Sequence, residues 1–358
     1  MTAALDDQIE IEKIDSGKIL ATIRLLPDQM EQAWGEVCEL KIPEKYFNSK
    51  NVVICGMGGS ALGGRIIDSL LTSRVNVPIE IFTEYDIPYY ANKDTLLIAS
   101  SYSGDTEETI NVVKEAELKN ADTFIVSTGG TLGDMAKEKK IPSYIFEPRS
   151  NPSGQPRMGL GYSIFSILAL LSKLKMLHIQ DHEVFKLATH LRSVIKDFDI
   201  DSSSHDNVAK NFSKKLINKL PVIVSSEHLK GVTHAFKNQL NENSKTFSVL
   251  FDIPELNHHL MEGLAHPKKA RELLQFVFFE SVNYRSEIRK RYKVTQDVIQ
   301  ANGYPYNTYV SKTKDNLEEI FEILIFGSFV SFYLAYLNNE DVSEIPWVDY
   351  FKAKLQKI

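Results

Sequence analysis

Cysteine is scarce in this sequence. Only Cys38 and Cys55 occur among 358 residues. Two cysteines cannot build the disulfide framework that stabilises many secreted domains. Their small number fits a reducing compartment, and we therefore predict a cytoplasmic protein.

Long apolar runs are also missing. The longest uncharged apolar run, 323–337, has 15 residues and is interrupted by Gly327 and Ser328. A membrane-spanning helix needs about 20 apolar residues, so this run predicts a buried helix and no membrane partner is expected. The first 18 residues, MTAALDDQIEIEKIDSGK, are polar and acid-rich, unlike a signal or transit peptide.

The sequence has no excess of positive charge. Its 41 Lys and Arg residues are outnumbered by 47 Asp and Glu residues, which gives a formal net charge of −6. Such a surface has no general attraction for nucleic acid, and residues 1–45 contain no basic recognition helix. We therefore predict no nucleic-acid partner, although the net charge does not exclude a local basic pocket.

What the sequence does contain is typical of a soluble globular protein, with 43% hydrophobic and 25% charged residues. Its length predicts two domains. Short, continuously apolar segments alternate with stretches long enough for a helix, a pattern that indicates parallel sheets covered on both faces. The predicted strands are 51–55, 79–82, 95–100, 123–127, 143–146, 221–226, 246–251, 275–280 and 307–310.

This pattern predicts an α/β fold with a parallel sheet in each half. A loop with three prolines and three glycines, 147–161, separates the two groups of strands. The predicted parts are an N-terminal helical segment (1–45), a first domain (46–150), a connecting loop with helices (151–215), a second domain (216–340) and a C-terminal tail helix (341–358).

A glycine-rich turn, GMGGSALGG, follows the first predicted strand. Gly58 and Gly59 allow backbone amides to approach a ligand closely, and the N-terminus of the following helix suits a phosphate. Three interpretations are open. Ser60 could bind a single phosphate; the turn could bind a dinucleotide, with Glu80 or Glu84 on the ribose; or it could bind nothing.

A second polar turn, SSYSGDTEET, follows the third predicted strand. It offers the hydroxyl groups of Ser101, Ser103 and Thr106. In an open α/β sheet, ligands bind outside the carboxyl ends of the strands, and both turns lie at such ends. Two such turns favour one compact phosphate over a long dinucleotide. The alternative is that these hydroxyls only cap a helix.

Several segments together resemble one protein family. GMGGSALGG, SYSGDTEET and STGGTLGDMA (127–136) are similar to the signature stretches of the sugar-isomerase (SIS) domain. PRMGLGY (156–162), NQLNENSK (238–245) and PELNHHLMEG (254–263) extend the resemblance to the bifunctional phosphoglucose/phosphomannose isomerases, which carry two SIS domains. The resemblance covers about residue 50 to the C-terminus. It departs from the family at Asp105, at Arg65 and around His259.

The resemblance implies two flavodoxin-like SIS domains, each a parallel sheet sandwiched by helices, and an aldose–ketose isomerase. The substrates implied are glucose 6-phosphate and/or mannose 6-phosphate with fructose 6-phosphate, interconverted through a cis-enediolate. Such a proton transfer needs no cofactor, and none is expected. The family also implies a homodimer in which the two subunits share each active site.

The family assigns roles to four residues of this chain. Glu242 is the implied base for the proton shuttle, and it is expected near the functional edge of the second sheet. His258 is the implied ring-opening group, which reaches the pocket from a partner subunit. Arg157 is implied to stabilise the enediolate, and Lys352 to assist ring opening.

Each role has a simpler alternative. Glu242 could be a solvated glutamate at a helix end, Arg157 a loop arginine paired with a surface acid, and Lys352 a solvated tail lysine. The neighbouring His258 and His259 could suggest zinc, but no third ligand has a clear spacing, and no metal is predicted. For the whole chain, a non-catalytic phosphosugar-binding protein and a nucleotide-dependent oxidoreductase are the competing functions.

Overall fold

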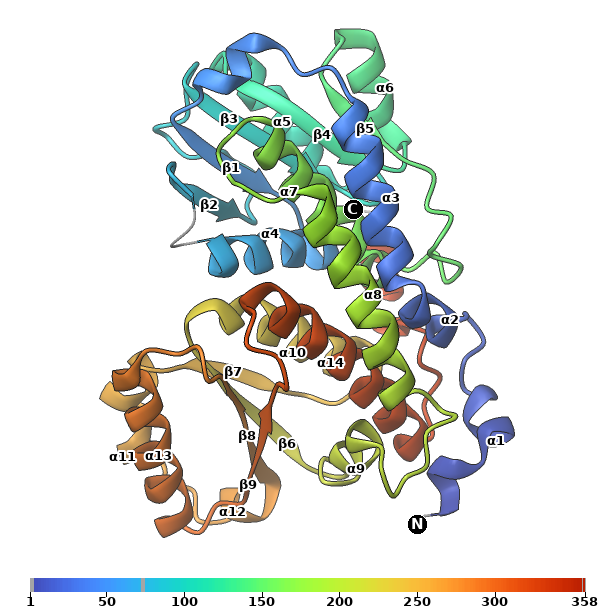
Figure 1. The fold of residues 1–358 in the computed structure, drawn as a ribbon, viewed down its shortest axis with the longest axis vertical. Helices are drawn as coiled ribbons and strands as arrows, with labels where there is room; N and C mark the ends of the chain where they lie inside the picture. Colours follow the sequence, from blue (N-terminus) through green and yellow to red (C-terminus); the bar gives the residue numbers. More distant parts are fainter. Residues whose placement is uncertain (1–2, 72–74, 356, 358) are drawn as a thin grey trace.

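Two parallel β-sheets organise the chain in the computed structural model, which describes residues 3–71, 75–355 and 357 (Figure 1). The first sheet has the order β2-β1-β3-β4-β5 and the second has the order β7-β6-β8-β9. The first sheet's strands are β1 (Asn51–Cys55), β2 (Ile79–Phe82), β3 (Thr95–Ser100), β4 (Asp122–Ser127) and β5 (Ser143–Ile145). The second sheet's strands are β6 (Leu220–Ser225), β7 (Val249–Asp252), β8 (Leu274–Glu280) and β9 (Tyr306–Val310).

The two sheets share one topology. In each, the first strand lies inside the sheet, the second pairs on one side of it and the third on the other, and all pairs are parallel. The chain therefore reverses its direction of winding between β1 and β3, and again between β6 and β8. Ligands of open α/β sheets bind at such a reversal. The predicted α/β fold with two parallel sheets is confirmed. Among the predicted strands, the one expected at 246–251 differs most from the structure, because it begins at Val249.

Helices α4 (Gly58–Leu71) and α10 (Lys230–Glu242) pack against each other between the two sheets (Figure 1). Gly231, at the start of α10, donates its amide to Ser69 Oγ near the end of α4 at 3.1 Å. A Cβ atom on Gly231 would lie 2.2 Å from the Arg65 carbonyl oxygen, so only glycine permits this approach. Because the start of one helix meets the end of the other, the end of α10 is brought toward the start of α4.

The most apolar helix is α14 (Asn316–Asn338), which contains the predicted buried run. Its 23 residues exceed the length of that run and would suffice to cross a membrane by length and composition. However, 89% of its apolar window is buried inside the molecule, where α14 packs against α8 (Asp181–Phe198), α9 (Val208–Lys214) and α10. It is therefore a core helix of this fold, as predicted.

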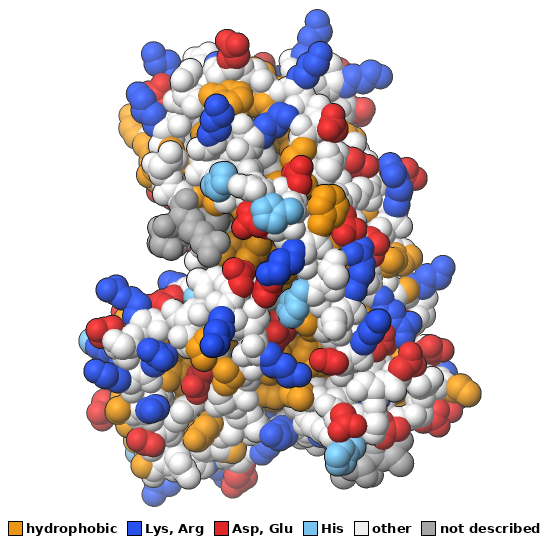
Figure 2. All heavy atoms as spheres, viewed as in Figure 1, with side chains coloured by type: hydrophobic (Ala, Val, Ile, Leu, Met, Phe, Trp, Pro, Cys, Tyr) orange, Lys and Arg blue, Asp and Glu red, His pale blue; other side chains and the backbone are white. Residues whose placement is uncertain are grey.

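The remaining helices lie around the sheets and at the two ends of the chain. Helix α3 (Leu26–Glu39) packs along α7 (Leu160–Lys173) and α8, while α15 (Pro346–Leu355) buries none of its residues. Positive and negative side chains are interspersed over the face shown in Figure 2. The other helices are α1 (Gln8–Glu12), α2 (Ile19–Arg24), α5 (Glu107–Leu118), α6 (Gly130–Lys139), α11 (Leu260–Gly263), α12 (Ala270–Leu273) and α13 (Ser286–Ala301). The domain boundaries stay predictions.

Candidate active site

The glycine-rich turn joins β1 to α4 at the carboxyl edge of the first sheet. Gly58 has a φ of +50°, which favours glycine, and nothing occupies the space where its Cβ would lie. Gly59 lies against the backbone of Arg157, because a Cβ on Gly59 would be 3.0 Å from both the Cα and the N of Arg157. Ser60 is buried and its Oγ accepts a hydrogen bond from the Tyr102 amide at 3.1 Å. The first turn is thus joined both to the second turn and to the Arg157 loop.

The hydroxyl-rich turn joins β3 to α5. The Ser101 and Thr106 hydroxyls are 2.7 Å apart, and Ser101 Oγ accepts the Gly104 amide at 3.1 Å. Thr106 stands at the N-cap position of α5, but its side chain makes no capping hydrogen bond. Ser103 is exposed, and its Oγ accepts the Asp105 amide at 3.3 Å. Simple helix capping therefore does not explain this cluster.

Asp105, one of the departures from the family pattern, connects the second turn to the start of α6. Its carboxylate accepts hydrogen bonds from the amide and the hydroxyl of Thr131, each at 2.9 Å. These bonds hold the pKa of Asp105 below its usual range. The added negative charge is thus paired with Thr131, and the turn remains intact.

Arg157 is buried, with 3% of its surface exposed, and its guanidinium is held on three sides. Nε donates to Asn243 Oδ1 at 2.8 Å and Nη1 to Gln155 Oε1 at 2.7 Å. Nη2 donates to the carbonyls of Val342 and Ser343 at 3.1 and 2.9 Å. A guanidinium has five N–H groups, so one N–H of Nη1 has no acceptor among the described residues. The structure does not match a loop arginine paired with a surface acid.

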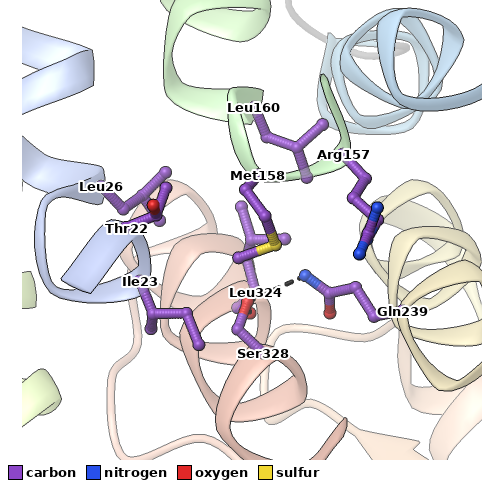
Figure 3. Close-up of a pocket in the computed structure, with 9 residues that line it drawn as sticks. All are labelled: Thr22, Ile23, Leu26, Arg157, Met158, Leu160, Gln239, Leu324 and Ser328. Atoms are coloured by element: carbon purple, nitrogen blue, oxygen red, sulfur yellow. Dashed lines mark hydrogen bonds between the residues drawn. The ribbon is translucent and has the colours of Figure 1, made fainter. Parts of the chain in front are cut away.

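Figure 3 shows the side of Arg157 that faces the core. The guanidinium lies beside Gln239 of α10, whose amide donates to Ser328 Oγ of α14 at 2.8 Å. The cavity lined by these residues has a volume of about 10 Å³, which is close to the minimum for one water molecule. A sugar phosphate cannot approach Arg157 from this side.

Glu242 is the last residue of α10. Its Oε2 lies 4.0 Å from Arg157 Nε, and 28% of the side chain is exposed. Burial raises the pKa of Glu242, and the positive charges of Arg157 and Lys352 partly oppose this rise. A pocket of about 550 Å³ opens beside it, between the end of α10 and the start of α15, a size suited to a small-molecule ligand. The alternative of a solvated glutamate at a helix end does not fit this environment.

The expected placement of Glu242 within its own sheet was wrong. A helix that precedes a parallel strand ends at the amino edge of the sheet, so Glu242 lies at the opposite edge from the carboxyl ends of β6 and β8. It instead joins the first domain's site because α10 runs antiparallel to α4. The helix pair therefore delivers the carboxylate to Arg157 and to the start of α4.

His258 and Lys352 are placed differently from the other two residues. His258 is exposed on a short 3₁₀ segment, Glu255–His258, that follows the carboxyl end of β7. It lies at the opposite edge of the second sheet from Glu242, so one chain does not bring these two together. Lys352 is exposed on α15, and its charge acts on Glu242.

Comparisons with known proteins identify the family of this chain. A model of the SIS domain matches residues 45–179, and a model of the bacterial phospho-glucose isomerase C-terminal SIS domain matches residues 205–355. The bifunctional phosphoglucose/phosphomannose isomerase of Caldicellulosiruptor bescii is 31% identical over 335 residues, which cover 93% of this chain and 97% of that protein. The chain belongs to this family. It is a sugar-phosphate isomerase.

Further relatives of this isomerase extend the comparison. The bifunctional phosphoglucose/phosphomannose isomerase of Thermoplasma acidophilum is 30% identical over 306 residues, covering 85% of this chain and 89% of that protein. Among solved structures, a putative tagatose-6-phosphate ketose/aldose isomerase from Clostridium novyi has a TM-score of 0.70 at 16% identity, covering 94% of this chain and 93% of that one. This last likeness shows a shared fold.

Sequence reasoning missed the residues that hold Arg157. Asn243 directly follows Glu242 and is fully buried; its Oδ1 accepts from Arg157 and its Nδ2 donates to Ser331 Oγ at 3.0 Å. Asn243 lies beside the predicted base and within the stretch NQLNENSK, and this position could have indicated its role. The carbonyls of Val342 and Ser343 left no such signal, because backbone acceptors carry no side-chain identity.

Proposed function

We propose that this isomerase interconverts glucose 6-phosphate and/or mannose 6-phosphate with fructose 6-phosphate through a cis-enediolate. The observation that carries the proposal is the 4.0 Å approach of Glu242 to Arg157, whose backbone packs on Gly59 of the first turn. A base and a fixed cation thus stand beside a turn suited to phosphate. The names of the relatives supply the substrate class.

The phosphate of the open-chain sugar would bind at the first and second turns. Gly58 and Gly59 offer amides at the start of α4, while Ser60, Ser101, Ser103 and Thr106 offer hydroxyls. Holding the phosphate fixes the distance from it to C1 and C2, which converts proton transfer into an intramolecular step. Substrate-binding and catalytic groups then act on opposite ends of one molecule.

In the aldose-to-ketose direction, Glu242 would take the proton from C2. The C–H electron pair forms the C1–C2 double bond, and the carbonyl π electrons move to O1 to give the enediolate. The free N–H of Arg157 Nη1 would donate to the enediolate oxygens, where charge develops. Glu242 then returns the proton to C1, the hydroxyl proton of O2 moves to O1, and the carbonyl forms at C2. No electrons leave the substrate, so the step needs no cofactor.

Ring opening precedes this step. We assign it to His258 of a second subunit, with Lys352 of α15 as a further proton donor. His258 is exposed and distant from Glu242 in its own chain, which suits a residue that serves a neighbouring site. Imidazole can give and take a proton near neutral pH. This assignment makes a homodimer with shared active sites part of the proposal.

The test is to incubate the protein with fructose 6-phosphate and resolve the products by NMR. We expect glucose 6-phosphate, mannose 6-phosphate or both from the wild type. The Glu242→Gln variant should lose about 10²–10⁴ in kcat and still bind fructose 6-phosphate, whereas the matched exposed control Glu138→Gln, on α6, should keep its activity. Substrate binding without any aldose would favour the non-catalytic phosphosugar-binding alternative. Near-normal turnover by Glu242→Gln would remove the assigned base.

A further inference from the structure

The second sheet has its own counterpart of the phosphate-binding edge. Since β6 and β8 occupy the places of β1 and β3, the segments that follow them correspond to the two turns of the first domain. Ser281 directly follows β8, as Ser101 directly follows β3. His228 lies in the turn between β6 and α10, as Gly58 and Gly59 lie at the turn between β1 and α4.

At this second edge, a carboxylate of the chain itself occupies the space between the two turns. Oε2 of Glu319, from the first turn of α14, accepts a hydrogen bond from Ser281 Oγ at 2.7 Å. His228 Nε2 lies 2.9 Å from the same oxygen, and Asn283 Nδ2 donates to it at 3.3 Å. Both turns therefore direct their polar groups to one oxygen atom.

This cluster is buried, unlike the open turn at Ser103 in the first domain. Glu319, Ser281 and His228 are only 1%, 3% and 6% exposed. The other carboxylate oxygen, Oε1, is buried and accepts no hydrogen bond within the described residues. Leaving a buried carboxylate oxygen unpaired is unfavourable, so the Glu319 carboxylate is stabilised here through Oε2 alone, on which the donors of both turns converge.

We propose that this is an oxyanion site that Glu319 fills from within. The three donors converge from the two turns of an SIS-type edge, and the ligand class they suit is a small oxyanion such as a carboxylate or phosphate. With Glu319 in place, the second domain binds no external anion, and each chain keeps one phosphosugar site. This inference does not depend on the reaction proposed above.

The site can be opened by Glu319→Ala. This change removes Cγ, Cδ and both oxygens, which together have the composition of acetate, while phosphate has one heavy atom more. We expect acetate and inorganic phosphate to raise the Tm of this variant by roughly 2 °C near tenfold Kd, relative to chloride at equal ionic strength. The isosteric Glu319→Gln keeps the space filled and should show only the response of the wild type, which includes phosphate bound in the first domain.

Two further measurements decide the outcome. The double variant Glu319→Ala/Ser281→Ala should lose the added response, because one of the converging donors is gone. A crystal structure of Glu319→Ala grown in phosphate should show the anion between His228 and Ser281. The proposal is overturned if Glu319→Ala responds to both anions no more than Glu319→Gln does. It is equally overturned if Glu319→Ala fails to fold in acetate and phosphate as well as in chloride, since a fitting anion should restore the missing group.

Discussion

Replacing Arg157 with lysine separates the charge of this residue from its shape. The guanidinium satisfies four buried or partly buried acceptors from three nitrogen atoms at once. A lysine ammonium keeps the charge but is a single nitrogen with three donors on a flexible stem. It cannot reach Asn243, Gln155 and the carbonyls of Val342 and Ser343 together.

We expect at least two of these acceptors to be left unpaired in Arg157→Lys. At ~1–3 kcal/mol for each unsatisfied buried group, the free energy of unfolding should fall by about 2–6 kcal/mol. The proposed enediolate donor on Nη1 would be lost at the same time, so we expect kcat for fructose 6-phosphate to fall while the proposed phosphate turns still bind substrate.

Equilibrium unfolding in urea measures the first effect, and a coupled isomerase assay measures the second. Arg149→Lys is the matched control, because the Arg149 side chain is 63% exposed and its ion-pair partners among the described residues are Glu36 of α3 and the exposed Glu147. Exposed pairs contribute about 0–1 kcal/mol, so this control should change little. If Arg157→Lys and Arg149→Lys lower the free energy of unfolding by the same small amount, the idea that its four hydrogen-bond acceptors fix Arg157 is refuted.

Four further predictions concern the site. Because burial raises the pKa of Glu242 above its usual value of 4.5 and the base acts deprotonated, kcat/KM should fall as the pH drops through that raised pKa; this acid limb should be absent in the residual activity of Glu242→Gln. The pKa of Glu242 is higher in the folded than in the unfolded protein, so the wild type loses stability as the pH rises from the unfolded-state pKa through the folded-state pKa. Urea unfolding at pH 7 should therefore find Glu242→Gln at least as stable as the wild type. A lower stability of Glu242→Gln would contradict the raised pKa. Gly59→Ala places a Cβ 3.0 Å from backbone atoms of Arg157 and Pro156 and should lower stability by ~1–3 kcal/mol together with kcat; Gly35→Ala, in an open helical position with nothing within 4 Å, should not. Finally, the inactive variants Glu242→Gln and His258→Asn can be mixed and allowed to exchange subunits. If each site takes one residue from each subunit of a two-fold dimer, the mixture should regain about one quarter of wild-type activity. No recovery in verified mixed dimers would place His258 in its own chain's site.

The strands could be predicted because burial on both faces leaves continuous apolar runs such as TLLIAS, which is fully buried as β3. The two turns could be predicted because the strand order puts the carboxyl ends of β1 and β3 side by side. Asp105, conspicuous in the sequence as a departure, proved to have a local partner in Thr131.

The meeting of Glu242 with Arg157 could not be predicted from the residues alone. It depends on how α10 crosses α4, which is set by the contact of Gly231 with Arg65 and Ser69, far from either functional residue. The filled edge of the second domain was also missed, since Ser281, His228 and Glu319 are spread over more than ninety residues and share no motif. Such contacts form only when segments that are distant in the sequence pack together in the folded chain.

The carbonyls of Val342 and Ser343 make the end of the chain part of the architecture around Arg157. The same segment is tied to the beginning of the chain, because the Val342 amide donates to the Ile14 carbonyl at 3.0 Å and the Gly17 amide donates to Ser343 Oγ at 2.9 Å. Proteolytic clipping before residue 342 would therefore release Arg157 Nη2, the segment around Ile14 and Gly17, and α15 in a single cut. Expression vectors that shorten this tail remove two of the acceptors that hold Arg157.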